Sequence, residues 1–198
     1  YNGVAILSKY PVSDITYNLP NFDQDKQSRY IEGFINIDKK GIRVASIYAP
    51  NGNPINSEKY SYKIEWLKKF CIYAEKLLEF EEYTFLGGDF NICPKSLDAA
   101  DENLLSNDAI YTTDVKNLYK NIINLGYYDS FRSINPDDPG FTYWDYGQSF
   151  KNDIGVRIDH FLISPYALDK VDKIYVDKEP RACEKPSDHT PLVLEIEI

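Results

Sequence analysis

Polar side chains follow the apolar run YTFL (83–86) in the segment GGDFN (87–91). Side chains alternate along an extended backbone, so Asp89 and Asn91 are expected to point to one side and Phe90 to the other, into the core. A carboxylate in this place can orient or deprotonate a water molecule, and a carboxamide can donate a hydrogen bond to an oxyanion. The same short pattern also occurs as an Asx-type turn that ends a strand, so both interpretations stay open at this point.

A second polar cluster, PSDHTP (186–191), stands just before the last apolar segment. His189 follows Asp188, and the prolines on either side restrict the local backbone. A lone surface histidine usually has no function. A histidine beside a carboxylate, however, can bind a phosphate oxygen or exchange a proton near neutral pH, and Asp188 can help to hold a hard cation.

The segment RIDHFLIS (157–164) places an acid inside an apolar strand pattern. Alternation puts Asp159 on the same face as Arg157 and puts His160 on the opposite face. A buried carboxylate needs a partner, and pairing of Asp159 with His189 would fix the imidazole tautomer and stabilise its charged form. His160 points away from Asp159 and is therefore expected to be structural.

Other polar residues stand at further strand ends. IYAPNG (47–52) ends a strand with Tyr48 and Asn51, a phenol and an amide that can both reach a phosphate, although a tyrosine at a strand end is most often a packing residue. Asp129 and Arg132 are expected to form a structural ion pair. No motif for a serine or cysteine nucleophile and no glycine-rich phosphate loop competes with these clusters. Together they indicate one site along one edge of a sheet.

Strand patterns dominate the chain, and helical patterns lie between them. Alternation predicts antiparallel strands over 30–37 and 42–48, joined by a turn at DKKG (38–41). From Ser57 the apolar spacing becomes that of an amphipathic helix, with Asn56 or Ser57 as its N-cap. The remaining predictions are a strand over 83–88, a helix over 114–126 capped by Asp114 and ended by Gly126, strands over 141–146, 156–164, 171–176 and 191–198, and a strand pattern in the opening GVAILSK (3–9).

This order of elements predicts an α+β fold, a sandwich in which two mainly antiparallel sheets pack face to face with helices outside. No repeat, low-complexity tract or linker marks a domain boundary. Residues 1–198 are therefore expected to form a single domain.

The net charge of −9 argues against binding a polyanion through overall attraction. It still allows a carboxylate-rich site that recruits a divalent cation and acts on phosphates. No stretch approaches the roughly 20 apolar residues of a membrane span, so a cytoplasmic protein without a membrane partner is expected. The cysteines are odd in number and lack CxxC spacing, which predicts free thiols at Cys71, Cys93 and Cys183.

Taken in order, IYAPNG, GGDFNICP, YYDSFR, FTYWDY, RIDHFLIS and EKPSDHTPLVLEI resemble the motif series of the exonuclease III family of apurinic/apyrimidinic endonucleases. This family belongs to the endonuclease/exonuclease/phosphatase superfamily. The ordered set covers almost the whole chain and is highly specific, whereas GDFN or SDH alone would support only the superfamily. The resemblance implies a four-layer α/β sandwich and a monomeric DNA repair nuclease that hydrolyses phosphodiester bonds in double-stranded DNA. It would cleave 5′ to abasic sites and also act on 3′ ends, as a 3′-to-5′ exonuclease and in 3′-end trimming, with Mg²⁺, or Mn²⁺ in its place.

The resemblance also implies a role for individual residues. Asp89 would activate or orient the attacking water, and Asn91 would support the water and the transition state. Asp159 would orient His189, which would bind the scissile phosphate oxygen. Tyr48 would contact the phosphate, Asn51 would contact the DNA backbone, and Asp188 would bind the metal together with Asp89 and Asn91. The residues implied to bind DNA or to line a pocket for the abasic sugar are Tyr143, Trp144, Val156, Arg157 and Ile158. Trp144 can equally be a core residue.

The chain departs from the family pattern in its first strands. A strand with a WN motif and a strand with a QE motif, whose glutamate is the principal magnesium ligand, are not present, so we expect a truncated chain that keeps the hydrolytic cluster with half of a metal cage. Cys183 stands where relatives commonly have a tryptophan. Two alternatives stay open, an inactive DNA-binding fragment and a superfamily phosphatase acting on a lipid or inositol phosphate. FTYWDY and RIDHFLIS argue against the phosphatase.

Overall fold

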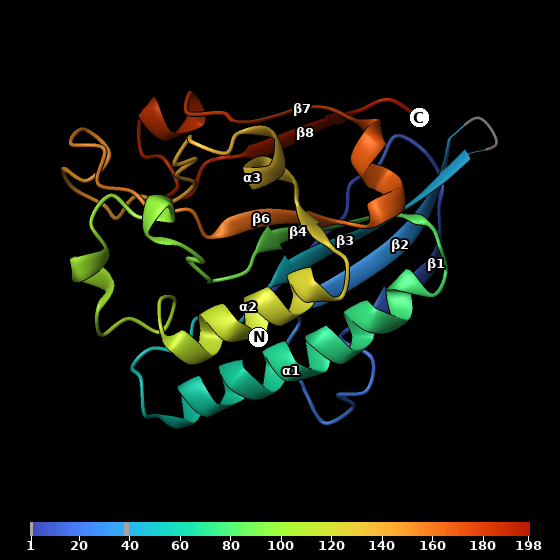
Figure 1. Ribbon diagram of the computed structural model, residues 1–198, viewed down its shortest axis with the longest axis horizontal. Helices are drawn as coiled ribbons and strands as arrows, with labels where there is room; N and C mark the ends of the chain where they lie inside the picture. Colours follow the sequence, from blue (N-terminus) through green and yellow to red (C-terminus); the bar gives the residue numbers. More distant parts are fainter. Residues whose placement is uncertain (1, 38–39) are drawn as a thin grey trace.

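The computed structural model describes residues 2–37 and 40–198. Its largest element is a six-stranded mixed sheet with the strand order β1-β2-β3-β4-β6-β5, and a second sheet pairs β7 with β8 (Figure 1). The strands are β1 (Val12–Tyr17), β2 (Tyr30–Ile37), β3 (Lys40–Tyr48), β4 (Tyr83–Asp89), β5 (Tyr128–Asp129), β6 (Asp159–Ile163), β7 (Val171–Val176) and β8 (Leu192–Ile196).

The helices begin at residues that cap them. α1 (Glu58–Leu78) follows Ser57, whose hydroxyl accepts a hydrogen bond from the Tyr60 amide, as predicted. α2 (Thr113–Asn124) is capped by Thr112, so Asp114 is not the N-cap but lies in the first turn. The short helix α3 is Ser130–Ile134, and the 3₁₀ helices are Ser96–Asp98, Glu102–Leu105, Pro165–Lys170 and Pro180–Ala182.

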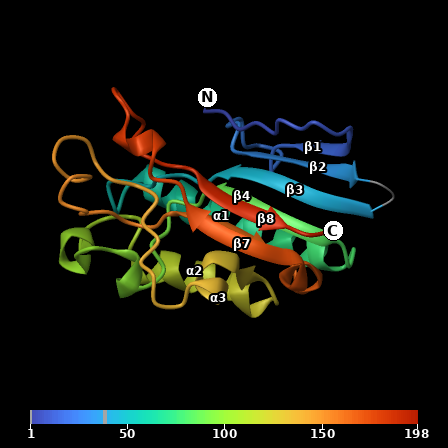
Figure 2. The same ribbon diagram turned by 90° about the horizontal axis from the view of Figure 1, so that it is seen from above.

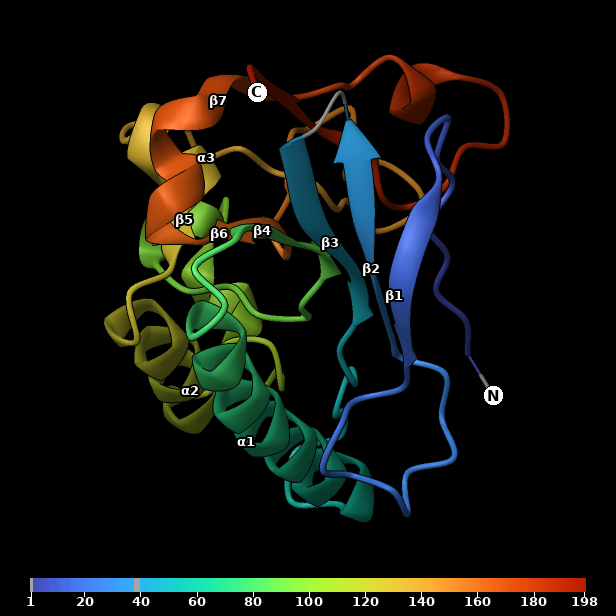
Figure 3. The same cartoon turned by 90° about the vertical axis from the view of Figure 1, so that its right-hand side faces the viewer.

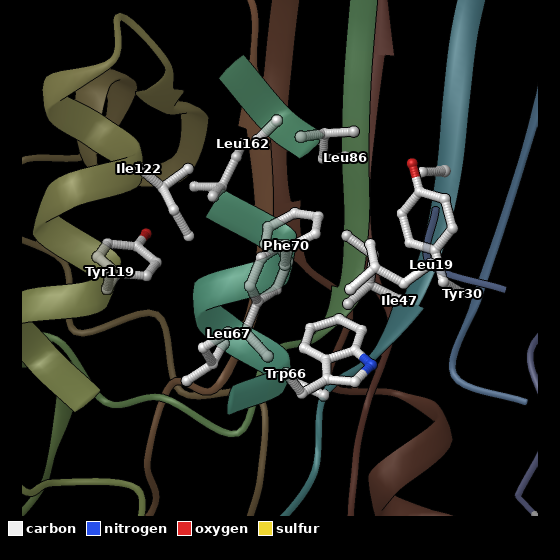
Figure 4. Packing of buried hydrophobic residues seen from close by; sticks show 14 of the residues in the cluster. Leu19, Tyr30, Ile47, Trp66, Leu67, Phe70, Leu86, Tyr119, Ile122 and Leu162 are labelled. Atoms are coloured by element: carbon white, nitrogen blue, oxygen red, sulfur yellow. The ribbon is translucent and has the colours of Figure 1, made fainter. Parts of the chain in front are cut away.

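Helices α1 and α2 cover one face of the large sheet (Figures 1 and 3). Figure 4 shows Trp66 and Phe70 of α1 pointing toward Ile47 and Leu86 of the sheet, and all four side chains are buried in one cluster. Because this helical face excludes water from the strands, burial of its apolar area is the main force that holds the layers together.

The small sheet covers the other face of the large sheet, over the part that contains β4 and β6 (Figure 2). Phe85 and Ile163 are buried beneath it, and Leu194 and Ile196 of β8 pack against their cluster. Helices α1 and α2, the large sheet and the small sheet therefore stack in this order as three layers, which confirms the predicted α/β sandwich of two sheets.

Several predicted elements differ in the structure. FTYWDY (141–146) is irregular rather than a strand and makes only isolated bridges through Tyr143. Residues 3–9 form no strand, whereas β1 was not predicted. Part of the predicted turn at 38–41 lies outside the described residues. Buried Trp144 explains the first difference, because it leaves the alternating pattern and donates its indole N–H to Asp153.

None of the helices in residues 2–37 and 40–198 combines the length and apolar character that crossing a membrane requires. All three cysteines are free thiols, as predicted.

Candidate active site

Three of the predicted residues stand side by side because of strand register. β3 and β4 are parallel with Tyr48 opposite Asp89, and β4 and β6 are antiparallel with Asp89 opposite Asp159. Paired residues on neighbouring strands point to the same face of a sheet. A phenol and two carboxylates therefore form a row across three strands, at the end of the sheet where the loops after β3 and β4 emerge (Figure 1).

The histidine of the C-terminal cluster reaches this row. His189 Nδ1 lies 2.8 Å from Asp159 Oδ2, which is the predicted pair. Burial alone would lower the pKa of His189, but the hydrogen bond and the charge of Asp159 outweigh burial and raise the pKa to about 9. The imidazole is therefore charged at neutral pH, with Nδ1–H donating to the carboxylate and Nε2–H left to bind an anion.

Asn91 holds the carboxylate of Asp89 from the following loop. Its backbone N–H donates to Asp89 Oδ1 (2.8 Å) and its Nδ2 donates to Asp89 Oδ2 (2.9 Å). Asn91 has a φ of +50°, the left-handed conformation that lets the side chain turn back toward Asp89. Burial raises the pKa of Asp89 to about 7, and the charge of Asp159 acts in the same direction. Such a carboxyl group can accept a proton from water near neutral pH.

The row opens into one cavity of about 550 Å³. Its lining includes Tyr48, Asp89, Asp159, Asp188 and His189, residues from four separate parts of the chain. The prediction of one site built from distant polar clusters agrees with this geometry.

A neighbouring cavity of about 290 Å³ is lined by Tyr143 and Val156 together with Leu105 and Ile110. The Tyr143 ring lies 5.1 Å from the His189 ring, so the two cavities adjoin. Ile158 is buried beneath them in the same apolar cluster. The cavity beside the row is thus apolar on the side of Tyr143 and Val156, and its lining also includes Asp101, Asp108, Asp145 and Ser149.

Arg157 and Trp144 do not lie where a DNA contact requires them. Both side chains are 0% exposed, and Arg157 donates to Asp98 (2.8 Å) and Asp129 (2.8 Å) inside the protein. Arg157 escapes the strand alternation because β6 begins only at Asp159. The prediction that Arg157 and Trp144 bind DNA is therefore wrong, and both residues have structural roles.

The predicted ion pair of Asp129 and Arg132 is also corrected. The Arg132 guanidinium pairs with Asp98 (2.6 Å), and Asp129 pairs with Arg157. His160 is buried, with Nδ1 3.0 Å from Arg157 and Nε2 2.8 Å from the Ile92 carbonyl, so its structural role is confirmed.

Two cations near the site were not predicted. Arg29 donates to the Tyr48 carbonyl (3.0 Å) and lies 5.0 Å from the centroid of the Tyr48 ring. Lys63 lies on the buried face of α1. Burial lowers the pKa of Lys63 to about 7, although the charges of Asp108 and Asp89 act to raise it. Lys63 could have been found by spacing, since it falls three and four residues before Trp66 and Leu67 on the buried stripe.

Carboxylate and amide oxygens are the ligands that Mg²⁺ prefers, and Asp89 and Asp188 line the same cavity. Within residues 2–37 and 40–198, however, no group of three or more His, Cys, Asp or Glu residues has a metal-holding arrangement. The donor chemistry fits a magnesium ion, but the described residues do not supply a complete cage.

Comparison with known proteins agrees with this geometry. A family model described as the Endonuclease/Exonuclease/phosphatase family matches residues 1–189. The chain belongs to this family. Exodeoxyribonuclease III of Haemophilus influenzae is 30% identical over 96% of this chain and 74% of the relative. A DNA-(apurinic or apyrimidinic site) endonuclease of Dictyostelium discoideum is 25% identical over the whole chain, which spans 54% of that relative.

Solved structures of the family are similar throughout the fold. The AP endonuclease of Archaeoglobus fulgidus has a TM-score of 0.89 and 32% identity, covering 96% of this chain and 73% of that one. The 3′ phosphatase NExo from Neisseria, bound to a product DNA hairpin, has a TM-score of 0.91 and 31% identity with the same coverage. The predicted family and the enzyme class, a hydrolase of the exodeoxyribonuclease III and AP endonuclease type, are confirmed.

Proposed function

We propose that this chain hydrolyses phosphodiester bonds of double-stranded DNA 5′ to abasic sites, and that it also removes nucleotides and blocking groups from 3′ ends. The observation that carries the proposal is the row of Tyr48, Asp89 and Asp159 with His189 at its end, all facing one cavity. Relatives named exodeoxyribonuclease III and AP endonuclease support it.

The charged end of the row binds the substrate. His189, held by Asp159, donates from Nε2 to an oxygen of the scissile phosphate and offsets the charge that develops there. Tyr48 lines the same cavity and donates a hydrogen bond from its phenol O–H to a phosphate oxygen near the leaving group. Asn51, on the exposed loop after β3, contacts the DNA backbone.

The carboxylate at the centre handles the water. Asp89 orients the nucleophile and accepts its proton, and a pKa of about 7 suits that task. Asn91 holds the carboxylate in place through two hydrogen bonds. The leaving 3′ oxygen takes a proton from solvent water as the P–O bond breaks, so hydrolysis ends with a 3′ hydroxyl and a 5′ phosphate.

A bound Mg²⁺ or Mn²⁺ ion would neutralise phosphate charge at this site. Asp188, Asp89 and Asn91 are the residues that we propose to hold it.

The adjoining cavity is the proposed site of the abasic sugar. Tyr143 and Val156 line it, and Ile158 lies in the same apolar cluster. A sugar without a base fits its volume of about 290 Å³ and can contact both the apolar and the polar side chains of the lining, whereas a stacked nucleotide stays in the duplex. We further propose that residues 1–198 act as one domain, as a monomer, and in the cytoplasm.

A direct assay tests the proposal. The protein is incubated with Mg²⁺ and a duplex carrying one abasic site, a duplex with a recessed 3′ end, or an inositol polyphosphate. We expect incision of the abasic strand and shortening from the 3′ end, with no phosphate released from the inositol. Phosphate release without DNA cleavage would point instead to a phosphatase, and DNA binding without cleavage would point to an inactive binding module.

A further inference from the structure

The ammonium group of Lys63 lies inside the protein, directly beneath the candidate site. Its side chain is 0% exposed and shares the buried face of α1 with Trp66, Leu67 and Phe70. A lysine is almost never fully buried unless its charge has partners, because removing an ammonium group from water costs several kcal/mol. The contacts of this one group therefore need an explanation.

Lys63 Nζ donates to three backbone carbonyls, those of Asn51 (3.0 Å), Asn91 (2.6 Å) and Ala109 (3.0 Å). An ammonium group has three N–H donors and no acceptor, so these three bonds use its full capacity. No carboxylate of the described residues lies within ion-pair distance of it. The Lys63 charge is therefore stabilised by backbone carbonyls in direct contact, and by the charges of Asp108 and Asp89 from beyond ion-pair distance.

Each carbonyl belongs to a different loop of the site. Asn51 follows β3, Asn91 follows β4, and Ala109 precedes α2. The loops also bond to each other directly, through Asn51 Nδ2 to Asn91 Oδ1 (3.2 Å) and Asn53 Nδ2 to Asp108 Oδ1 (3.0 Å).

The lysine stem also packs closely against the first loop. Gly52 has a φ of +87°, and a Cβ placed there would come within 2.6 Å of Lys63 Cδ. The loop passes over the stem where only a glycine fits. Both the stem and the head of Lys63 are therefore in fixed contact with the loops.

We propose that Lys63 is a positioning residue for hydrolysis, which clamps the three loops through their carbonyls and so fixes Asn91 against Asp89. The effect extends to the reacting carboxylate because Asn91, whose carbonyl Lys63 holds, donates to Asp89 from both its backbone N–H and its side-chain Nδ2. The role in hydrolysis rests on the proposed function, whereas the clamp itself is a property of the fold.

The test compares Lys63→Met, which keeps the length of the stem but has no donor, with Leu67→Ala as a control. Leu67 is buried one helical turn further along α1 but contacts none of the three carbonyls, so this variant reports on lost stability alone. Hydrogen exchange is measured on all the proteins, and kcat and KM are measured on the abasic-site duplex at a temperature well below each Tm. Lys63→Gln, which keeps two N–H donors, serves if the Met variant does not fold.

We expect Lys63→Met to raise exchange in 49–54, 90–94 and 107–111 by about tenfold or more, while α1 stays protected. We expect kcat to fall by about a hundredfold with little change in KM, since a small displacement of a reacting group is enough for that loss. Lys63→Gln should lie between the Met variant and the unmodified protein, and Leu67→Ala should keep its kcat.

Unchanged exchange in the three loops of Lys63→Met, or an equal change in Leu67→Ala, would overturn the clamp. Faster loop exchange with an unchanged kcat would overturn its role in hydrolysis. If the unmodified protein cleaves no DNA, the proposed function fails, and the exchange comparison still decides whether Lys63 holds the loops.

Discussion

Asp89 receives both of its hydrogen bonds from one residue, Asn91, and its oxygens face the carboxylate of Asp159 across the strand pair. Replacing Asp89 with Asn keeps the size of the side chain but removes its ability to accept a proton. We expect turnover of an abasic-site duplex to fall on the order of a hundredfold or more, with binding of the duplex retained.

Asp137→Asn is the matched control for Asp89→Asn, because it removes the same charge from an exposed position. It should leave turnover unchanged. Steady-state kinetics and a binding assay on both variants give the answer, and full turnover in Asp89→Asn would remove Asp89 from the mechanism.

The charge of His189 depends on Asp159. A base whose pKa is raised to about 9 in the folded protein, from about 6.5 unfolded, adds stability that is present below pH 6.5 and lost as the pH rises through 9. In Asp159→Asn the midpoint should fall well below 9, because only the charges of Asp89 and Asp188 then oppose the effect of burial. NMR titration of the imidazole in metal-free buffer measures it, and an unchanged midpoint would show that Asp159 does not control the charge.

Residues at the ends of strands could be predicted from the sequence because each stands beside an apolar run that shows where a strand stops. Tyr48, Asp89, Asp159 and His189 were brought together on that basis, and the strand register agrees. Asp98 was not predicted, since it lies 59 residues from its partner Arg157 and no local pattern connects them.

Among the elements, β4 comes so close to β3 that one position admits only glycine. Gly88 has a φ of +141°, and a Cβ there would lie 2.0 Å from the Ile47 carbonyl oxygen of β3. Gly88→Ala should force the strands apart between Tyr48 and Asp89 and should either prevent folding or lower stability by more than about 3 kcal/mol.

Gly147→Ala is the control for this strand effect. Gly147 also has a positive φ, +90°, but a Cβ would meet nothing within 4 Å. Only backbone strain remains, so we expect a cost of about 1 kcal/mol. Urea unfolding of both variants separates strain from the steric clash, and equal losses would contradict the expectation.

The buried ion pair between Asp129, at the end of β5, and Arg157, which precedes β6, makes the protein sensitive to acid. Burial opposes ionisation of Asp129, but the charge of Arg157 holds the pKa of Asp129 well below its usual value. An acid with a lowered pKa adds stability above its unfolded pKa of about 3.9, and this stability is lost as the pH falls below that value.

Asp129→Asn should therefore lower the unfolding free energy at pH 7 by about 3 kcal/mol and flatten its decline below pH 4. Urea unfolding from pH 2 to 7 tests both effects. A decline as steep as in the unmodified protein would mean that other carboxylates cause the acid sensitivity.

Strands along which apolar and polar residues alternate were predicted well, because a strand with one buried face requires that alternation. The strand prediction for FTYWDY (141–146) was wrong, because its aromatic residues pack within an irregular loop. There Tyr143 bridges to both Val156 and His189, and such packing leaves no regular signal in the sequence.

For the whole molecule, metal binding should be weak. Two carboxylates of the cavity, Asp89 and Asp188, offer ligands, but the described residues form no three-ligand cage. We expect cleavage to need Mg²⁺ or Mn²⁺, to stop on addition of EDTA, and to saturate only on the order of millimolar Mg²⁺. Asp188→Asn should raise that concentration further. Saturation at micromolar Mg²⁺ would contradict this expectation.

α1 connects the parallel strands β3 and β4, and the same helix carries Lys63. The helix that connects β3 to β4 therefore also determines the direction in which the Lys63 ammonium group points toward the loops that follow these strands. One residue inserted between Lys63 and Trp66 would turn Nζ by about 100° relative to the buried face that Trp66 and Phe70 form, whereas an insertion in the last turn of α1 would leave that relation unchanged. Tolerance to insertions should therefore differ sharply between the two ends of one helix.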